Sequence, residues 1–329
     1  MRIPGIKTAK TLSRWVQARV LGGALILGYH RVANVTRDEY EVCVTPKHFA
    51  EQVEMLSRYA HPISLAKLVQ CLKTGSLPPK SVAVTFDDGY TDNLLQAKPV
   101  LEKYSIPASV FVCTGYVGRE FWWDELDRLV MSSQVELGTL HLDAGEKSFV
   151  WDQPNVTPEE DLDVRRKLLH GLYNFLLALD IQDQSQAMNT IRNWSGISSD
   201  EATTRGMNPD ELLQLADGGL IEIGAHTRHH PMLPRLSLER QREEIISSKH
   251  DLESLLGKRV DGFAYPNGTA TDDAKRIVRE AGFAFACTSL HDVVRPASDL
   301  HELTRFWQKD VDGEKFLRVL RLWMKADRV

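Results

Sequence analysis

The sequence predicts an α/β protein in which parallel strands form a sheet or a barrel. Short apolar segments alternate with amphipathic helical segments along most of the 329 residues. The alternation stops between about residues 118 and 205 and then resumes, which indicates an insertion. Carboxylate and imidazole side chains directly follow two of the apolar segments. Because catalytic groups gather where the carboxyl ends of parallel strands meet, these side chains are the first candidates for a functional site.

The first elements are set by apolar runs and by capping residues. A short buried strand is expected in "GALILGYH", residues 23–30. A helix begins after Thr45, an N-cap followed by proline, and its apolar spacing continues to about Tyr59. A second helix is bounded by Ser64 and Gly75. The array continues with the strand "SVAVTFDDG" (81–89), the helix "TDNLLQAKPVLEKY" (91–104) interrupted by Pro99, and the strand "PASVFVCTG" (107–115).

The insertion contains no alternating strand–helix units of the earlier kind. It contains the segment "FWWDELDRLV" (121–130), a hairpin in 135–151 and a helical piece in 158–179. The alternation of strands and helices then returns with a helix capped by Asn208, a strand at 220–227 and a helix from Ser237 to Gly257. A strand and turn at 260–268 and a helix at 271–282 follow. The last elements are strands at 283–289 and 303–310 and a closing helix at 314–326. The expected organisation is a basic N-terminal arm (1–24), a barrel (25–118 and 206–312), a mostly helical insertion that caps the active face (119–205) and a C-terminal helix (313–329).

Composition excludes some classes of function. The net charge of -5 gives no global basic field for nucleic acid. The four cysteines are far apart and form no CxxC pair, so they are expected to be small buried side chains in a reducing compartment.

The N-terminal arm is basic, and no acidic residue precedes Asp38. Its apolar run from Val20 to Leu27 is too short to span a bilayer, and no A-x-A-like cleavage site follows it, which disfavours secretion. Apolar residues at helical spacing (Leu12, Trp15, Val16 and Val20) indicate an amphipathic helix. Either it docks on the protein's own surface, which is slightly favoured, or it rests on an anionic membrane. The expected location is cytoplasmic, with peripheral contact to the inner membrane as an option.

Two strand ends carry the chemistry. Asp87 and Asp88 are adjacent carboxylates, which repel each other unless the turn is solvated or a cation lies beside them. His226 and His230 follow another strand and share one face if the chain turns helically there. Each feature alone occurs often by accident. Together, at the ends of two strands of one array, they provide two imidazoles and one carboxylate, the ligand count of a catalytic zinc site with one position left for water.

Three motifs resemble a known family. "TFDDG" (85–89), "HTRHHP" (226–231) and "FAYPNG" (263–268) are similar, in that order, to the first three motifs of the polysaccharide deacetylase (NodB-homology) family. The resemblance covers about residues 25–118 and 207–310 and is greatest to bacterial exopolysaccharide de-N-acetylases. It implies a distorted (β/α)7-type barrel and a metal-dependent hydrolase of sugar N-acetyl groups.

Carried over to this sequence, the resemblance assigns Asp88, His226 and His230 to the metal and Asp87 to the general base. A metal-bound water then attacks the acetyl carbonyl while a histidine acts as acid. The ligand types favour Zn²⁺, and Co²⁺, Ni²⁺ or Mn²⁺ would fit the same set.

The third motif departs from one common form of the family, in which an arginine holds the base. Ala264 occupies that place here, and "LTRFW" offers Arg305 for the same task. Asn267 stands where the family usually has an aromatic residue, and its backbone N–H is the candidate oxyanion donor.

Two histidines compete for the role of general acid, a role that suits imidazole. His30 ends the first predicted strand, as in the exopolysaccharide branch, whereas His291 lies in "TSLHD", which resembles a late family motif only superficially. His30 is favoured because it lies at the rim where catalytic groups gather.

Four further residues are candidates for substrate contact: Trp122, Trp123, Asp124 and Tyr265. Tryptophan rings stack on sugar faces, but the two tryptophans could instead anchor the insertion, or each could do one task. The predicted substrate is a glycan or a lipid-linked sugar precursor. The alternatives are a hydrolase of a non-carbohydrate amide in the same fold and a non-catalytic glycan-binding module.

Overall fold

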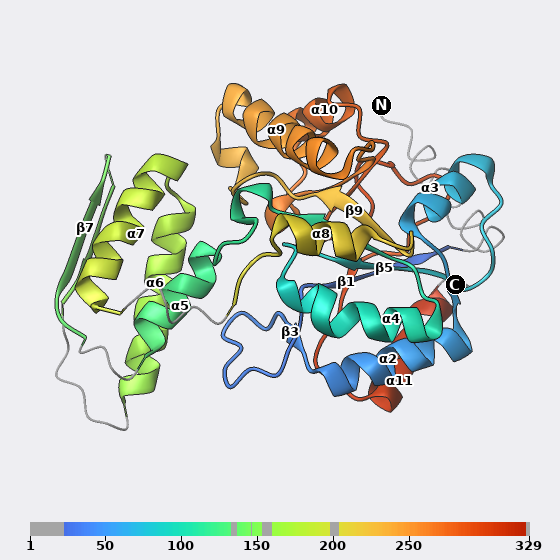
Figure 1. The fold of residues 1–329 in the computed structure, drawn as a ribbon, viewed down its shortest axis with the longest axis horizontal. Coiled ribbons are helices and arrows are strands. Elements are labelled where there is room, and N and C mark those ends of the chain that lie inside the picture. Colours follow the sequence, from blue (N-terminus) through green and yellow to red (C-terminus); the bar gives the residue numbers. More distant parts are fainter. Residues whose placement is uncertain (1–22, 133–136, 146, 153–159, 198–203, 327–329) are drawn as a thin grey trace, which may run out of the picture.

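The chain folds around a parallel sheet that curls into an incomplete barrel (Figure 1). The computed structural model describes residues 23–132, 137–145, 147–152, 160–197 and 204–326, so the predicted N-terminal amphipathic helix lies outside the described residues. Strand order along the sheet is β11-β10-β9-β6-β5-β1-β12. The strands are β1 (Leu25–Tyr29), β5 (Ser81–Phe86), β6 (Ala108–Val112), β9 (Ile221–Ala225), β10 (Gly262–Ala264), β11 (Phe285–Cys287) and β12 (Phe306–Trp307), and the short β4 (His61–Pro62) pairs with β5.

The two edges of the sheet nearly meet. The N–H of Thr288 donates to the carbonyl of Leu303 at 2.8 Å, and the N–H of Leu303 donates to the carbonyl of Ala286 at 2.9 Å. These bonds join the β11 edge to the segment that leads into β12. The predicted distorted (β/α)7-type barrel is thereby confirmed.

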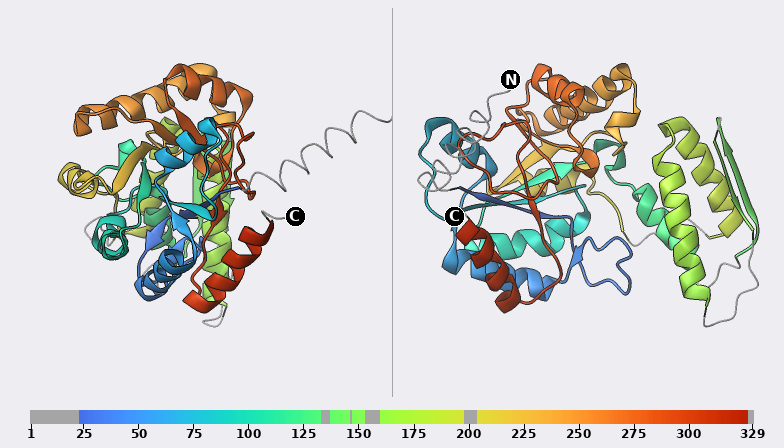
Figure 2. Two further views of the ribbon diagram at one scale, coloured as in Figure 1. Left: turned by 90° about the vertical axis from the view of Figure 1, so that its right-hand side faces the viewer. Right: turned by 180° about the vertical axis from the view of Figure 1, so that it is seen from behind.

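Helices cover the outside of the sheet (Figure 2). They are α2 (Pro46–Tyr59), α3 (Leu65–Thr74), α4 (Lys98–Tyr104), α8 (Pro209–Ala216), α9 (Leu238–Leu256), α10 (Asp272–Glu280) and α11 (Gly313–Ala326). The predicted caps are present: Thr45 and Ser64 each accept a bond from a first-turn N–H, and Asn208 forms a capping box with Glu211. Gly75 ends α3 with a left-handed φ of 66°.

The helix at 91–104 is continuous and is not broken at Pro99. A π-helical turn at Asn93–Ala97 precedes α4, and Pro99 lies in the first turn of α4. The change of hydrogen-bond spacing there accommodates a residue that has no N–H to donate.

The insertion forms a separate layer beyond the carboxyl ends of the strands (green in Figure 1). It consists of α5 (Trp122–Met131), the hairpin β7 (Leu140–Ala144) and β8 (Lys147–Trp151), α6 (Asp161–Leu177) and α7 (Ile181–Ser195). It has its own apolar core, which includes Leu168, Leu172 and Ile191. Helix α7 was not predicted, because its segment "IQDQSQAMNTIRNWS" is mostly polar and buries few apolar side chains.

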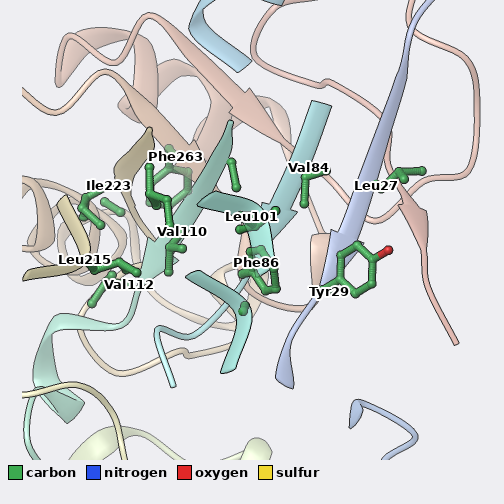
Figure 3. Close-up of a cluster of buried hydrophobic side chains, with 14 of the residues drawn as sticks. Leu27, Tyr29, Val84, Phe86, Leu101, Val110, Val112, Leu215, Ile223 and Phe263 are labelled. Carbon is green, nitrogen blue, oxygen red and sulfur yellow. The ribbon is translucent and has the colours of Figure 1, made fainter. Parts of the chain in front are cut away.

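Side chains alternate between the two faces of each strand, as the pleat requires. Leu27, Tyr29, Val84 and Phe86 point outward into the core beneath the helices (Figure 3). The residues between them point into the barrel. The inward-pointing residue that directly follows each strand therefore lies at the carboxyl end of the barrel. No helix among the described residues is long and apolar enough to cross a bilayer.

Gly224 of β9 is closely packed by its neighbours in the barrel. A Cβ at this position would be 2.5 Å from a ring carbon of Phe111 and 3.0 Å from the carbonyl oxygen of Gly262. Gly224→Ala is therefore expected to lower the free energy of unfolding by about 1–3 kcal/mol through overpacking. Urea unfolding followed by circular dichroism measures this. Gly138→Ala is the control, because among the described residues its new Cβ would meet Trp194 alone, at an ordinary 3.7 Å; equal effects of both changes would contradict the packing argument.

Candidate active site

The site lies at the carboxyl ends of four neighbouring strands. His30 follows β1, Asp87 follows β5, Cys113 follows β6 and His226 follows β9. Each continues the inward-pointing alternation of its strand: Ala83 and Thr85 precede Asp87 on β5, as Ile26 and Gly28 precede His30 on β1. The strand pairing therefore brings these four side chains to one end of the barrel.

Asp87 is held by a fully buried arginine. Arg305 donates Nη1 to Oδ1 of Asp87 at 2.6 Å and Nη2 to Oδ2 at 2.7 Å, and its Nε donates to the carbonyl of Thr288 at 3.0 Å. Burial is the largest single effect and raises the pKa of Asp87, but the charge and hydrogen bonds of Arg305, together with the neighbouring His226 and His30, outweigh it and bring that pKa to about 2. Asp87 is therefore ionised at neutral pH and fixed in orientation.

Asp88 faces both histidines of the second motif. Its Oδ1 is 3.7 Å from Nε2 of His226 and 3.9 Å from Nε2 of His230. These distances are too long for hydrogen bonds. They are short enough for one ion to touch both atoms, since ligand bonds of about 2.1 Å on each side span roughly 4.2 Å.

The protonation of these groups suits a cation. Nδ1 of His226 lies 2.7 Å from the carbonyl of Ala264, so this nitrogen carries the proton and Nε2 presents its lone pair to Asp88. Burial lowers the pKa of His226 and lowers that of His230 far more, which keeps both rings neutral. Burial and the charges of Asp87 and Asp124 raise the pKa of Asp88 well above its usual range. Two neutral imidazoles beside a carboxylate that forms no ion pair with lysine or arginine among the described residues fit a divalent metal.

The turn that carries the histidines is not helical, so that part of the prediction is wrong. Thr227 (φ 63°) and His230 (φ 56°) are both left-handed, and Oγ1 of Thr227 accepts the N–H of His230 at 3.1 Å. This turn, rather than a helical face, brings the rings of His226 and His230 to a centroid distance of 4.9 Å. His229 points elsewhere and binds Glu244 through Nδ1 at 2.7 Å.

Cys113 lies beside the site, although it was predicted only to be a small buried side chain. Its sulfur, a carboxylate oxygen of Asp88 and a ring nitrogen of His226 lie within 4.8 Å of one another. The thiol donates to the carbonyl of His226 at 3.3 Å, and burial raises its pKa well above the usual range, so it stays protonated. Its position directly after β6, on the inward-pointing side of the strand, could have identified it as a site residue from the sequence.

The two candidate acids lie in different surroundings. His30 is stacked on Trp307 with centroids 4.5 Å apart, and Asp87, Arg305 and His226 are close enough to shift its pKa. Burial is the main cause that lowers this pKa to about 4, below the value near 7 expected of the acid. His291 is exposed on the loop after β11 and packs against Phe306.

The third motif, "FAYPNG", places fewer side chains at the site than was predicted. Asn267 is exposed at a left-handed turn (φ 54°) that follows β10. Tyr265 does not line the site, which corrects the prediction. Its side chain is fully buried against Phe263, and its hydroxyl donates to the carbonyl of His301 at 3.0 Å.

The two tryptophans of the insertion have different tasks. Trp122 is buried in the insertion and stacks on Tyr173, so its predicted contact with substrate is wrong. Trp123 lies beside the site, with its ring 5.0 Å from that of His230 and its Nε1 donating to the hydroxyl of Tyr90 at 2.7 Å. Asp124 faces a neighbouring cavity, and burial is the main cause that raises its pKa to about 7.

Comparison with known proteins identifies the family. A family profile described as polysaccharide deacetylase matches residues 74–163 and 179–286. A poly-beta-1,6-N-acetyl-D-glucosamine N-deacetylase of Staphylococcus aureus is 30% identical over 313 residues, which cover 91% of this chain and 82% of that protein. The chain belongs to the polysaccharide deacetylase family.

Solved structures of this polysaccharide deacetylase's relatives share its fold. IcaB from Ammonifex degensii aligns with a TM-score of 0.60 and 20% identity over 94% of this chain and 98% of that one. The deacetylase PplD of Streptococcus pyogenes, solved in complex with acetate, aligns with a TM-score of 0.55 and 20% identity over 91% and 98% of the two chains.

The family membership settles the class of protein. This polysaccharide deacetylase is a hydrolase that removes N-linked acetyl groups from carbohydrate, and the alternative of a non-catalytic binding module is set aside. Its family is metal-dependent, and the described residues contain an Asp/Cys/His group that can hold an ion.

Replacing Arg305 tests how much the buried ion pair with Asp87 contributes to the free energy of unfolding. Arg305→Met leaves the Asp87 carboxylate buried without its cation, so we expect the free energy of unfolding at pH 7 to fall by about 3–5 kcal/mol. The pKa of Asp87 then rises above its unfolded value, so the variant should regain stability as the pH is lowered from 7 to 5. In the native protein the pKa of folded Asp87 is below its unfolded value, so Asp87 stabilises the protein at neutral pH. That contribution is lost as the pH falls through about 2.

Urea unfolding at the two pH values measures both effects. The double variant Asp87→Asn/Arg305→Met is the control, since it buries no unpaired charge and should be more stable than Arg305→Met. Equal stability of the two variants would show that the pair carries no such cost.

Proposed function

We propose that this polysaccharide deacetylase removes acetyl groups from N-acetylglucosamine units of a β-1,6-linked polysaccharide. The single observation that carries the chemistry is the placement of an ionised Asp87, fixed by Arg305, next to the cluster of Asp88, His226 and His230. The substrate class is supported by the name of the Staphylococcus aureus relative.

Asp88, His226 and His230 would hold the metal, with zinc preferred for a site of two imidazoles and one carboxylate. When bound, a divalent metal lowers the pKa of water from about 15.7 to near 7 and polarises the acetyl carbonyl. Cys113 stays outside this set, because its protonated thiol is already committed to the carbonyl of His226.

Asp87 acts as the general base. Its carboxylate is ionised at neutral pH, and its Oδ2 lies 3.7 Å from Nε2 of His226, so it borders the same space as the ligand cluster. Arg305 occupies both carboxylate oxygens in a fork and prevents rotation. Asp87 therefore accepts the proton of the attacking water from one fixed direction.

His30 delivers the proton to the leaving amine. The stack on Trp307 fixes the plane of the imidazole. Because the pKa of His30 is lowered, the ring is neutral before substrate binds, and it takes up the proton that Asp87 has accepted from the attacking water. An imidazolium with a low pKa then gives up that proton readily to the amine. The backbone N–H of Asn267 would stabilise the oxyanion.

The place of action is also a proposal. The basic and amphipathic sequence of residues 1–24 supports work at the cytoplasmic face of the inner membrane, where a lipid-linked precursor would be an accessible form of the substrate.

Metal content and acetate release test the proposed site together. We expect about one zinc ion per purified chain, and loss of that ion in His226→Ala. Asp87→Asn should keep the metal, since Asp87 is not a ligand, yet release acetate from a β-1,6-linked N-acetylglucosamine oligomer about 10²–10⁴-fold more slowly. Elemental analysis and an acetate assay make the measurement. An Asp87→Asn enzyme of normal rate would remove its role as base, and hydrolysis of simple amides but not of the oligomer would favour the non-carbohydrate alternative.

The two histidines can be separated by substitution. His30→Ala should slow acetate release by about 10²–10⁴-fold, because the amine leaves unprotonated. His291→Ala should change the rate by less than about twofold, since its ring is exposed and packs against Phe306. The reverse ranking would restore the late histidine as the acid.

A further inference from the structure

A cavity of about 580 Å³ lies between α5 of the insertion and residues 31–43, a segment that begins with β2 (Arg31–Val32) and ends at the start of β3 (Cys43–Val44). Its walls include three arginines and five acidic residues: Arg31, Arg37, Arg128, Asp38, Glu39, Glu120, Asp124 and Asp127. The volume is in the range typical of sites for small ligands. None of these residues was placed in the chemistry of acetyl removal, apart from the prediction that Asp124 contacts substrate.

The arginines of the cavity already have acidic partners. Arg31 binds Asp92 at 3.0 Å. Arg128 binds both carboxylate oxygens of Glu120, at 3.0 and 2.7 Å. Arg37 approaches one oxygen of Asp127 at 3.8 Å. The positive charge at the cavity is thus committed to fixed neighbours.

Two carboxylate oxygens of α5 have no such partner. Oδ2 of Asp124 and Oδ1 of Asp127 are both buried, and neither has a hydrogen-bond partner among the described residues. The two residues are three positions apart on one helix, so they share a face. Leaving buried carboxylate oxygens without donors is costly. The wall therefore presents two acceptors that call for a donor with positive charge.

The cavity adjoins the catalytic residues at two points. Arg31 in its wall follows His30 directly in the chain, and Asp124 follows Trp123, whose ring is 5.0 Å from that of His230. A polymer with one sugar unit at the site would therefore have a neighbouring unit within reach of α5.

The missing partner has the features of an organic cation. Among the described residues, the groups of three or more metal-ligating side chains that converge on one point do not include Asp124 or Asp127. The cavity is also far larger than an ion. Acetyl removal leaves an amine on the sugar, and a protonated amine offers three N–H donors to oxygens spread over a wall.

We propose that this cavity is a subsite for a sugar unit that has already lost its acetyl group, with its ammonium held by Asp124 and Asp127. The inference rests on the proposed function, because it takes the product of that reaction as its ligand. The subsite makes the enzyme prefer partly deacetylated polysaccharide chains. The enzyme then acts on N-acetylated units that lie next to units already deacetylated.

Equilibrium binding tests the subsite without catalysis. Calorimetry with the full-length protein at pH 7 compares a β-1,6-linked glucosamine tetramer with the β-1,6-linked glucose tetramer, which has a hydroxyl in place of each amine. Neither ligand has an acetyl group to lose. We expect the glucosamine tetramer to bind at least about tenfold more tightly, as a charge-assisted hydrogen bond of about 1.5 kcal/mol implies.

The variants Asp127→Asn and Asp124→Asn should each reduce that preference to below about threefold, because an amide oxygen keeps the shape but loses the charge. Asp273→Asn is the matched control, since it removes one exposed carboxylate of α10 and should leave the preference unchanged. Equal binding of the two tetramers by the native protein, or a preference that survives both cavity variants, would overturn the subsite.

Failure of the proposed function would look different. If the native protein prefers the glucosamine tetramer but releases no acetate from the N-acetylated oligomer, the subsite stands and the assigned reaction does not. If acetate is released at equal efficiency from fully and partly acetylated oligomers and the tetramers bind equally, the reaction stands and the subsite is wrong.

Discussion

The buried ion pair between Arg305 and Asp87 is the interaction on which the site depends. Arg305 precedes β12 at one edge of the sheet, and Asp87 follows β5, so the pair connects two strands separated by β1. Taking both charges out of water is expensive, and the cost is recovered only because the fork geometry and the bonds to Thr85 and Thr288 satisfy the guanidinium. With Asp87 fixed, the free space for substrate is confined to the side occupied by Asp88 and the histidines.

The insertion is part of this arrangement because its first helix contacts the barrel next to the site. Trp123 on α5 donates to Tyr90, which follows the two aspartates by only two residues. Arg31 lies over the ring of the same tyrosine at 4.7 Å. The position of α5 therefore depends on the motif that supplies the base, and the wall that α5 offers to substrate is set by the same contacts.

Much of the site followed from patterns that are local in sequence. The paired aspartates and the paired histidines each end a strand, and alternation along a strand decides which side chains face inward. Other features depended on contacts distant in sequence. Tyr265 belongs to the core because its hydroxyl meets His301, Trp122 is covered by Tyr173, and the turn at 226–230 is held by left-handed residues that no helical pattern anticipates. The helix α7 was not predicted although its buried residues lie at helical spacing, because one of the four is Gln184 and the rest of the segment is mostly polar.

Three residues of the site, Asp88, Thr227 and His230, have positive φ angles although none is glycine. Such a backbone costs about 1–3 kcal/mol at each position, and glycine would remove the cost. Selection for stability alone would favour glycine at all three positions, whereas selection for the side chains opposes it. The family's history can be followed at these positions: a lineage that has ceased to turn over substrate is free to drift to glycine there, and one that has kept its reaction is not.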